Sequence, residues 1–120
     1  MFVPQRWIEM NLNTSILQYI EDVNKIEDNP DVDLLRKIAE SMGPSIYNSD
    51  ANTVSSSDQE ELDRVRKNFL VKKLGLEDTD ELNVGINAVI EKYGKSNRNK
   101  HRVVVYYLLT KHYNKEQLFK

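Results

Sequence analysis

The sequence predicts an all-α protein, a compact single-domain bundle of five or six helices around a central apolar C-terminal helix. Apolar residues recur at helical spacing along most of the chain. Capping residues and Gly or Pro residues separate the periodic stretches from one another. The 120 residues, 39% of them hydrophobic and 30% charged, fit one folded domain rather than a linker or a disordered chain.

Two helices are predicted on either side of Asn29-Pro30. The first is capped by Asn13 or Thr14, and it ends at Asn29 because a residue before proline is disfavoured in the α region. The second starts after Asp31 and ends at Gly43-Pro44. Their apolar faces are Ile16, Tyr19, Ile20, Val23 and Ile26 in the first, and Leu34, Leu35, Ile38, Ala39 and Met42 in the second.

A polar stretch, 45–57, has no helical period and predicts a loop held to the core by Ile46, Tyr47 and Val54. Ser57 and Glu60 then have the spacing of a capping box, which predicts a third helix that ends at Gly75. A fourth helix begins at Asp78 or Thr79 and ends at Gly94. The residues expected to face inward are Leu62, Val65, Phe69, Leu82, Ile86, Val89, Ile90 and Tyr93.

The fifth segment, 97–112, contains residues 103–107, which favour strands by intrinsic propensity. No other stretch resembles a partner strand, and a buried strand without a partner leaves its backbone groups without hydrogen bonds. A helix satisfies its own backbone and can be apolar on all sides when it is central. We therefore expect Ser96 to cap a buried helix. Residues 1–10 fit no helix well and are predicted to be an extension preceding a single domain over 11–120.

Composition and spacing exclude several kinds of chemistry. The absence of Cys excludes disulfides, thiolate metal sites and Cys nucleophiles. His101 and His112 would lie about 16 Å apart along one helix, too far to bind the same ion. Ser55–Ser57 lacks the motif of a nucleophilic serine, and no phosphate-binding glycine loop is present. We therefore expect no metal site and no cofactor, and lean towards a protein that is not an enzyme.

Two features bear on location. The longest apolar run, 103–109, is shorter than the roughly 18 to 20 residues that span a bilayer. The first residues lack the basic and apolar regions of a signal peptide. The expectation is a cytoplasmic protein with no membrane association.

Charge is distributed unevenly along the chain, although its net value is only −2. Residues 1–66 contain thirteen acids and six bases, whereas residues 88–120 contain two acids and eight bases. Two interpretations are open. The two ends can neutralise each other in the fold, or the basic end can meet an anionic partner.

The basic residues concentrate where the fifth helix is expected to start. Cations at a helix N-terminus are unfavourable by roughly 0.3 to 1 kcal/mol each, and Arg98 and Arg102 are spaced to repel each other. Free N–H groups beside basic side chains form a typical anion site. The anion could be internal acids, a small anion or acidic protein, or nucleic-acid phosphates. The candidate anion- or partner-binding residues are Lys95, Ser96, Asn97, Arg98, Asn99, Lys100 and Arg102.

Four blocks of sequence, GPSIYN at 43–48, NFLVKKLGL at 68–76, YGKSNRNK at 93–100 and VYYLL at 105–109, occur in this order. Together they resemble a small bacterial family known only as a domain of unknown function. The resemblance covers about residues 10–119. It implies a small all-helical domain in a bacterial cytoplasm, and it implies no activity and no catalytic residue.

Three functions remain open at this point. The first is a non-enzymatic interaction module that binds a protein or small anion through the basic helix start. The second is a nucleic-acid-binding protein that uses the same residues. The third is an enzyme with an unrecognised pocket near Tyr47, Asn48 and Asp50. A homo-oligomer is also open, because a short bundle can leave an apolar stripe uncovered.

Overall fold

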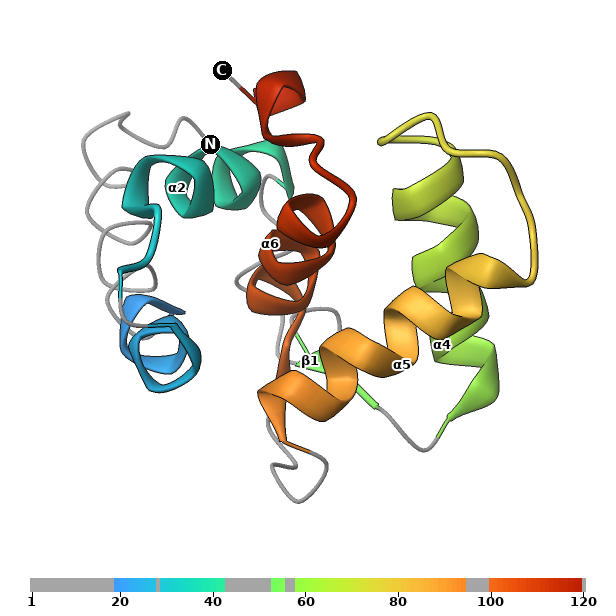
Figure 1. Ribbon diagram of the computed structural model, residues 1–120, viewed down its shortest axis with the longest axis horizontal. Helices are drawn as coiled ribbons and strands as arrows, with labels where there is room; N and C mark the ends of the chain where they lie inside the picture. The colour runs from blue at the N-terminus through green and yellow to red at the C-terminus, as the bar shows by residue number, and fades with distance from the viewer. Residues whose placement is uncertain (1–18, 28, 43–52, 56–57, 95–99, 120) are drawn as a thin grey trace, which may run out of the picture.

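The computed structural model describes residues 19–27, 29–42, 53–55, 58–94 and 100–119. They fold as a compact helical bundle, which confirms the predicted all-α class (Figure 1). Its elements are a helical segment at 19–26, α2 (Val32–Met42), β1 (Thr53–Val54), α4 (Gln59–Val65), the π-helix η2 (Arg66–Val71), α5 (Glu81–Tyr93), β2 (Lys100–His101), α6 (Arg102–His112) and the 3₁₀-helix η3 (Glu116–Phe119).

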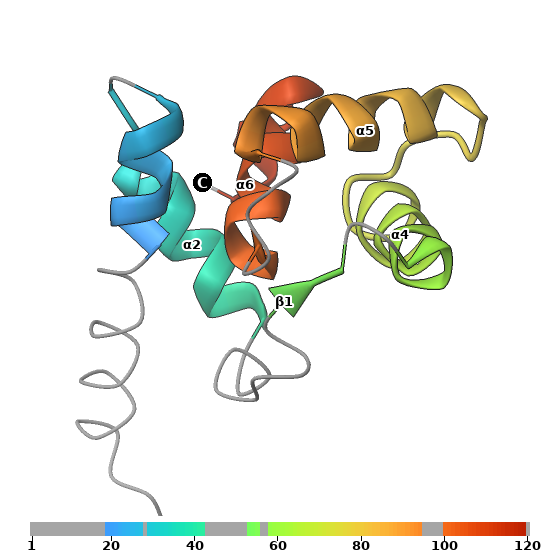
Figure 2. The same ribbon diagram turned by 90° about the horizontal axis from the view of Figure 1, so that it is seen from below.

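The apolar helix α6 lies in the middle of the bundle. In both ribbon views it stands between α2 on one side and α4 with α5 on the other (Figures 1 and 2). Most of its residues are buried, as the sequence predicted. Its one buried polar residue, Thr110, donates a hydrogen bond of 2.7 Å to the carbonyl of Tyr106, so its hydroxyl is satisfied within the helix. The buried residues of α6 are Val103, Val104, Val105, Tyr107, Leu108, Leu109 and Thr110.

The helix ends follow local capping chemistry. Asp31 Oδ1 accepts the backbone N–H of Leu34 at 3.1 Å, as predicted for the start of α2. Asp58, one residue after the predicted Ser57, caps α4 by accepting the N–H of Glu60 at 3.0 Å. Gly94 has a φ of +110° directly after α5, a conformation open to glycine, and ends that helix as predicted.

The predicted start of the last helix is wrong. Lys100 and His101 are extended and pair antiparallel with β1, His101 opposite Thr53 and Lys100 opposite Val54. The helix therefore begins at Arg102, and the predicted cap Ser96 lies outside the described residues. The partner strand comes from the stretch predicted as a loop. Two residues are too short a strand for alternation to be visible in a sequence.

The predicted third helix changes its winding partway along. After α4 the chain continues as the π-helix η2, a form that is rare in proteins. The wider turn brings Phe69 and Leu70 to the core side together. Phe69 stacks on Tyr106 of α6, with ring centroids 3.9 Å apart and planes 6° from parallel. This stack joins the outer helices to the central one.

The end of α6 is packed closely on α5. Tyr113, which follows α6, lies directly over Gly85, where a β-carbon would overlap the tyrosine ring. Glycine at this position therefore lets the two elements approach each other. No helix in the described part of the chain has both the length and the apolar character needed to cross a membrane.

Candidate functional site

Only two of the seven predicted anion-binding residues, Lys100 and Arg102, belong to the described part of the chain. The other five, residues 95–99, lie outside it, as do Tyr47, Asn48 and Asp50 of the predicted pocket. Lys100 is 1% exposed in β2, and burial lowers the pKa of its ammonium group. It therefore does not present its charge to solvent.

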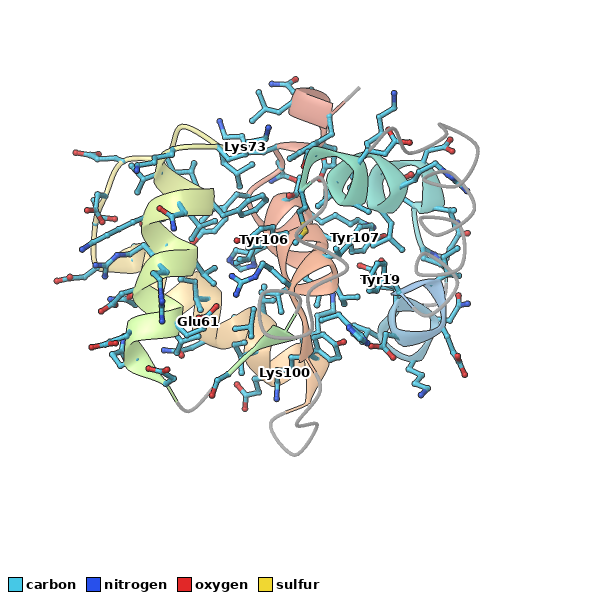
Figure 3. The ribbon with its side chains drawn as sticks, turned by 180° about the vertical axis from the view of Figure 1, so that it is seen from behind. Tyr19, Glu61, Lys73, Lys100, Tyr106 and Tyr107 are labelled. Atoms are coloured by element: carbon cyan, nitrogen blue, oxygen red, sulfur yellow. The ribbon has the colours of Figure 1, made fainter. Side chains whose placement is uncertain are left out.

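Arg102 finds its counter-ion inside the molecule. Its guanidinium forms an ion pair with the carboxylate of Glu61 on α4, and the two side chains are only 16% and 15% exposed. It also lies 3.4 Å from the hydroxyl of Tyr106. Figure 3 labels both of these partners, Tyr106 on α6 and Glu61 on α4. Burial acts to lower the pKa of Arg102, but the hydrogen bonds and charges of Tyr106 and Glu61 outweigh it and raise that pKa. For this residue, the interpretation that acids of the N-terminal half neutralise the basic end is confirmed.

The neighbouring polar contacts at the N-terminal end of α6 are also internal. The hydroxyl of Tyr93 donates to Asp22 at 2.5 Å and accepts the backbone N–H of His101 at 3.1 Å. Burial and the hydrogen bond to Asp22 raise the pKa of Tyr93, so it stays protonated at neutral pH. Tyr93 thus joins α5, β2 and the segment 19–26.

Positive charge meets solvent at the opposite end of α6. A pocket of about 300 Å³ opens there between α5, α6 and the residue that follows the segment 19–26. We name it the basic pocket. Its polar lining is Lys92, Lys111, His112 and Glu27, and its apolar lining is Ala88, Val89 and Leu108.

One carboxylate serves two lysines in the basic pocket. Glu27 accepts hydrogen bonds from Lys111 at 3.2 Å and from the hydroxyl of Tyr107 at 2.8 Å, and Lys92 lies 3.8 Å from its other oxygen. Although burial opposes it, the hydrogen bond to Glu27, with the charges of Tyr107 and Glu27, raises the pKa of Lys111. Lys111 therefore stays cationic at neutral pH. Two lysines face one carboxylate, so one formal positive charge remains in excess.

Helix geometry explains why these cations are tolerated. Lys92 lies in the last turn of α5, and Lys111 and His112 lie in the last turn of α6. A helix C-terminus carries a partial negative charge, which favours cations. The fold thus places three basic side chains together where each is locally stable.

The hydroxyl of Tyr107 also contacts a second pocket. The Tyr107 hydroxyl accepts a hydrogen bond from the backbone N–H of Asp31 at 2.8 Å. Burial, with a smaller contribution from Glu27, raises the pKa of Tyr107, so the hydroxyl keeps its proton and donates a hydrogen bond to Glu27. Tyr107 is completely buried and links the backbone at the start of α2 to the basic pocket.

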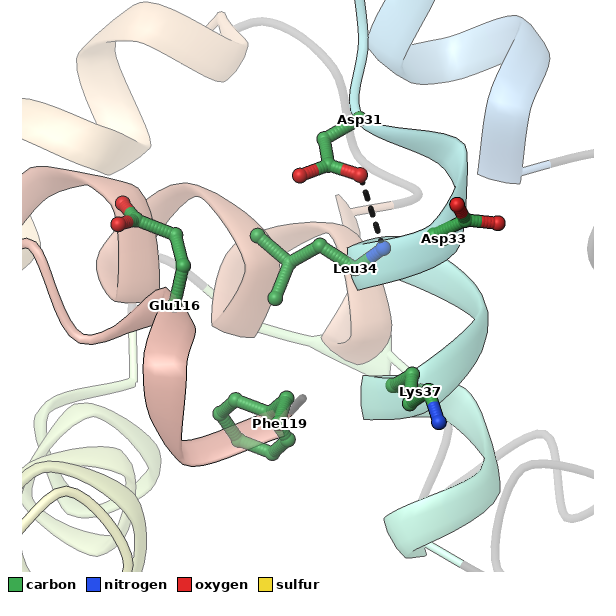
Figure 4. A pocket seen from close by; sticks show the side chains of 6 residues that line it. All are labelled: Asp31, Asp33, Leu34, Lys37, Glu116 and Phe119. Atoms are coloured by element: carbon green, nitrogen blue, oxygen red, sulfur yellow. Dashed lines mark hydrogen bonds between the residues drawn. The ribbon is translucent and has the colours of Figure 1, made fainter.

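The second pocket, of about 320 Å³, lies between the first turns of α2 and η3 (Figure 4). We name it the acidic pocket. Three carboxylates and one ammonium line it, so it has an excess of two negative charges. Its lining is Asp31, Asp33, Glu116 and Lys37, with the apolar side chains of Leu34 and Phe119 between them.

Among the described residues, excess positive charge lies at the C-terminal end of α6, where no local sequence pattern indicated it, whereas residues 95–99 of the predicted site lie outside the described part of the chain. Lys111 and His112 are in the basic third of the chain, but Glu27 and Tyr107 are 80 residues apart and their contact leaves no local pattern. Among the described residues, no group of three or more metal-ligating side chains is placed to hold an ion. The pockets therefore provide charge and apolar surface.

A family model described as "Protein of unknown function (DUF2853)" matches residues 18–117. Because this match spans most of the sequence, the chain belongs to that family. The resemblance to a domain of unknown function is thereby confirmed, while the individual blocks, the bacterial source and the 1–10 extension stay predictions. A comparison with curated proteins finds no match.

Proposed function

We propose that this chain is a non-enzymatic interaction module that binds an anionic group of a partner through the basic pocket. The observation that carries the proposal is that Lys92 and Lys111 share the single carboxylate of Glu27. The pocket keeps excess positive charge over an apolar floor. Of the two lysines, Lys92 is the more accessible to a ligand, with a side chain that is 54% exposed against 33% for Lys111.

The dimensions of the pocket suit a small group. Its volume of about 300 Å³ is at the low end of ligand sites, which run from roughly 300 to 1,000 Å³. A carboxylate on a short apolar stem, such as an Asp or Glu side chain of a protein, fits both parts of the lining. Lys92 would donate a charge-assisted hydrogen bond, which is about twice as strong as a neutral one.

The described members of the predicted basic segment do not contribute to this site. Lys100 is buried and Arg102 is held by Glu61, so neither supplies a free cation to a phosphate backbone. Glu27 is occupied by Tyr107 and Lys111 and is not free to act as a catalytic base. The proposal therefore favours binding over catalysis, and an acidic protein surface over a nucleic acid.

The test is a titration of the ¹⁵N-labelled chain with a capped hexaglutamate peptide at low salt. We expect saturable shifts at α5 and α6, and a Lys92→Glu variant should bind about tenfold more weakly, equivalent to about 1.4 kcal/mol. Lys67→Glu is the matched control, because Lys67 is exposed on η2 and does not line the pocket. Equal binding by the two variants, or no binding by the wild type at a concentration where it is monomeric, would overturn the proposal.

A further inference from the structure

We infer that the anionic partner is a second copy of this chain, whose acidic pocket meets the basic pocket in a closed two-fold dimer. The inference rests on the proposed function, because it names the partner of the same pocket. Three independent features of the described residues support it: opposite charge, exposed apolar side chains beside the acidic pocket, and the closeness of the two pockets.

The charges of the two pockets are complementary. The acidic pocket has an excess of two negative charges, and the basic pocket has an excess of one positive charge. Asp33, exposed in the first turn of α2, is available to meet the exposed Lys92 of another copy. Contacts of this kind guide association and set its orientation, and salt screens them.

Apolar surface accompanies the acidic pocket. The large hydrophobic side chains exposed in the described part of the chain are Val32, Val84 and Leu118. Two of them adjoin the acidic pocket in sequence, since Val32 lies between Asp31 and Asp33, and Leu118 precedes Phe119. Leu118 is 51% exposed. Exposed apolar side chains beside polar ones are typical of a protein–protein contact.

The position of the two pockets favours a closed pair. The hydroxyl of Tyr107 touches Asp31 of the acidic pocket and Glu27 of the basic pocket, each at 2.8 Å. This buried side chain therefore connects the two linings through a pair of hydrogen bonds. A two-fold axis between neighbouring patches of opposite charge makes each contact twice, which is the usual symmetry of a homodimer.

Sedimentation velocity on the full chain tests the inference. At low salt we expect a species of twice the 14.0 kDa chain mass at high concentration, which dissociates on dilution or at high salt. The single variants Asp33→Lys and Lys92→Glu should each be monomeric, because each places like charges at both contacts. An equimolar mixture of the two variants should restore the dimer, because every contact in the mixed pair again joins opposite charges.

Matched controls are Glu77→Lys and Lys67→Glu, which reverse exposed charges outside both pockets and should dimerise as the wild type does. A monomeric wild type at high concentration and low salt would overturn the inference. So would dimers of Asp33→Lys and Lys92→Glu, or a mixture of them that stays monomeric. A monomeric wild type that still binds hexaglutamate would overturn the dimer alone, whereas loss of both would overturn the proposed function as well.

Discussion

The two ends of α6 both carry basic residues, but the fold treats them in opposite ways. At the N-terminal end, Lys100 is buried and Arg102 is held by Glu61 on a neighbouring helix. At the C-terminal end, Lys111 and Lys92 share Glu27 and remain one-third and one-half exposed. The first end uses its charge to fix one helix against another, and the second leaves its charge partly exposed to solvent.

The difference shows that the number of charges in a segment does not tell whether they are available. An ion pair removed from water adds little net stability, but losing one partner leaves an uncompensated charge behind. An exposed pair is screened by solvent and can exchange partners with little loss. The predictions below test this contrast between structural and available charge, beginning with the largest effect.

The largest loss of stability is expected when the mostly buried Arg102–Glu61 ion pair is broken. Replacing Glu61 with Gln leaves Arg102 in a mostly buried site without its counter-ion, and should destabilise the fold by about 3 kcal/mol. Urea denaturation followed by circular dichroism measures the change. Glu60→Gln is the control, since Glu60 is exposed and should change stability by less than about 0.5 kcal/mol. Equal midpoints for the two variants would show that the pair is not structural.

Alkaline pH should weaken both ends of α6. The folded-state pKa values of Tyr93 and Tyr107 are raised, so the folded state holds these protons more tightly than the unfolded chain. The contribution of each tyrosine to the free energy of unfolding is complete below its unfolded-state pKa of about 10. Between that pH and the folded-state pKa it falls by about 1.4 kcal/mol per pH unit. The pKa of Lys100 is lowered in the folded state, so this residue makes stability rise with pH between its lowered pKa and about pH 10.5.

The measurement is the free energy of unfolding between pH 8 and pH 12 for the wild type and for Tyr93→Phe. The variant is less stable at neutral pH, because Asp22 and His101 lose a partner, but its stability should fall less steeply above about pH 10. The contribution of Lys100 is common to both proteins and cancels in the comparison. Parallel curves would mean that Tyr93 does not titrate differently in the folded state.

The buried helices of this fold could be predicted from the sequence, whereas the strand pairing and the ion pairs between distant residues could not. Residues 103–107 are predicted to be helical despite their strand propensity, because a helix satisfies its own backbone hydrogen bonds where a buried strand without a partner cannot. The structure confirms this prediction. The short strand before it was missed, since Lys100 and His101 pair with two residues of a polar stretch. Arg102 and Glu61 lie 41 residues apart, so tertiary packing decides which acid neutralises which base.

Substitution of Tyr107 should reduce stability moderately, because its hydroxyl contacts residues of both pockets. Tyr107→Phe removes the hydrogen bond to Glu27 and leaves the N–H of Asp31 without its acceptor, for a loss of about 1 to 2 kcal/mol. Tyr113→Phe is the control, because the buried hydroxyl of Tyr113 has no hydrogen-bond partner among the described residues and its removal should not destabilise the fold. Thermal unfolding of the two variants measures the difference. If Tyr113→Phe is the more damaging change, the bridging role assigned to Tyr107 is wrong.

The smallest effect on stability, and the sharpest test of available charge, is expected for Lys92→Ala. Lys92 is more than half exposed and 3.8 Å from a carboxylate that Lys111 and Tyr107 already satisfy, so its removal should change stability by less than about 0.5 kcal/mol. Binding of hexaglutamate should nevertheless weaken severalfold, whereas Lys67→Ala should alter neither property. Unfolding and titration on the same samples separate the two roles. A large loss of stability in Lys92→Ala would place this lysine with Arg102, as part of the scaffold.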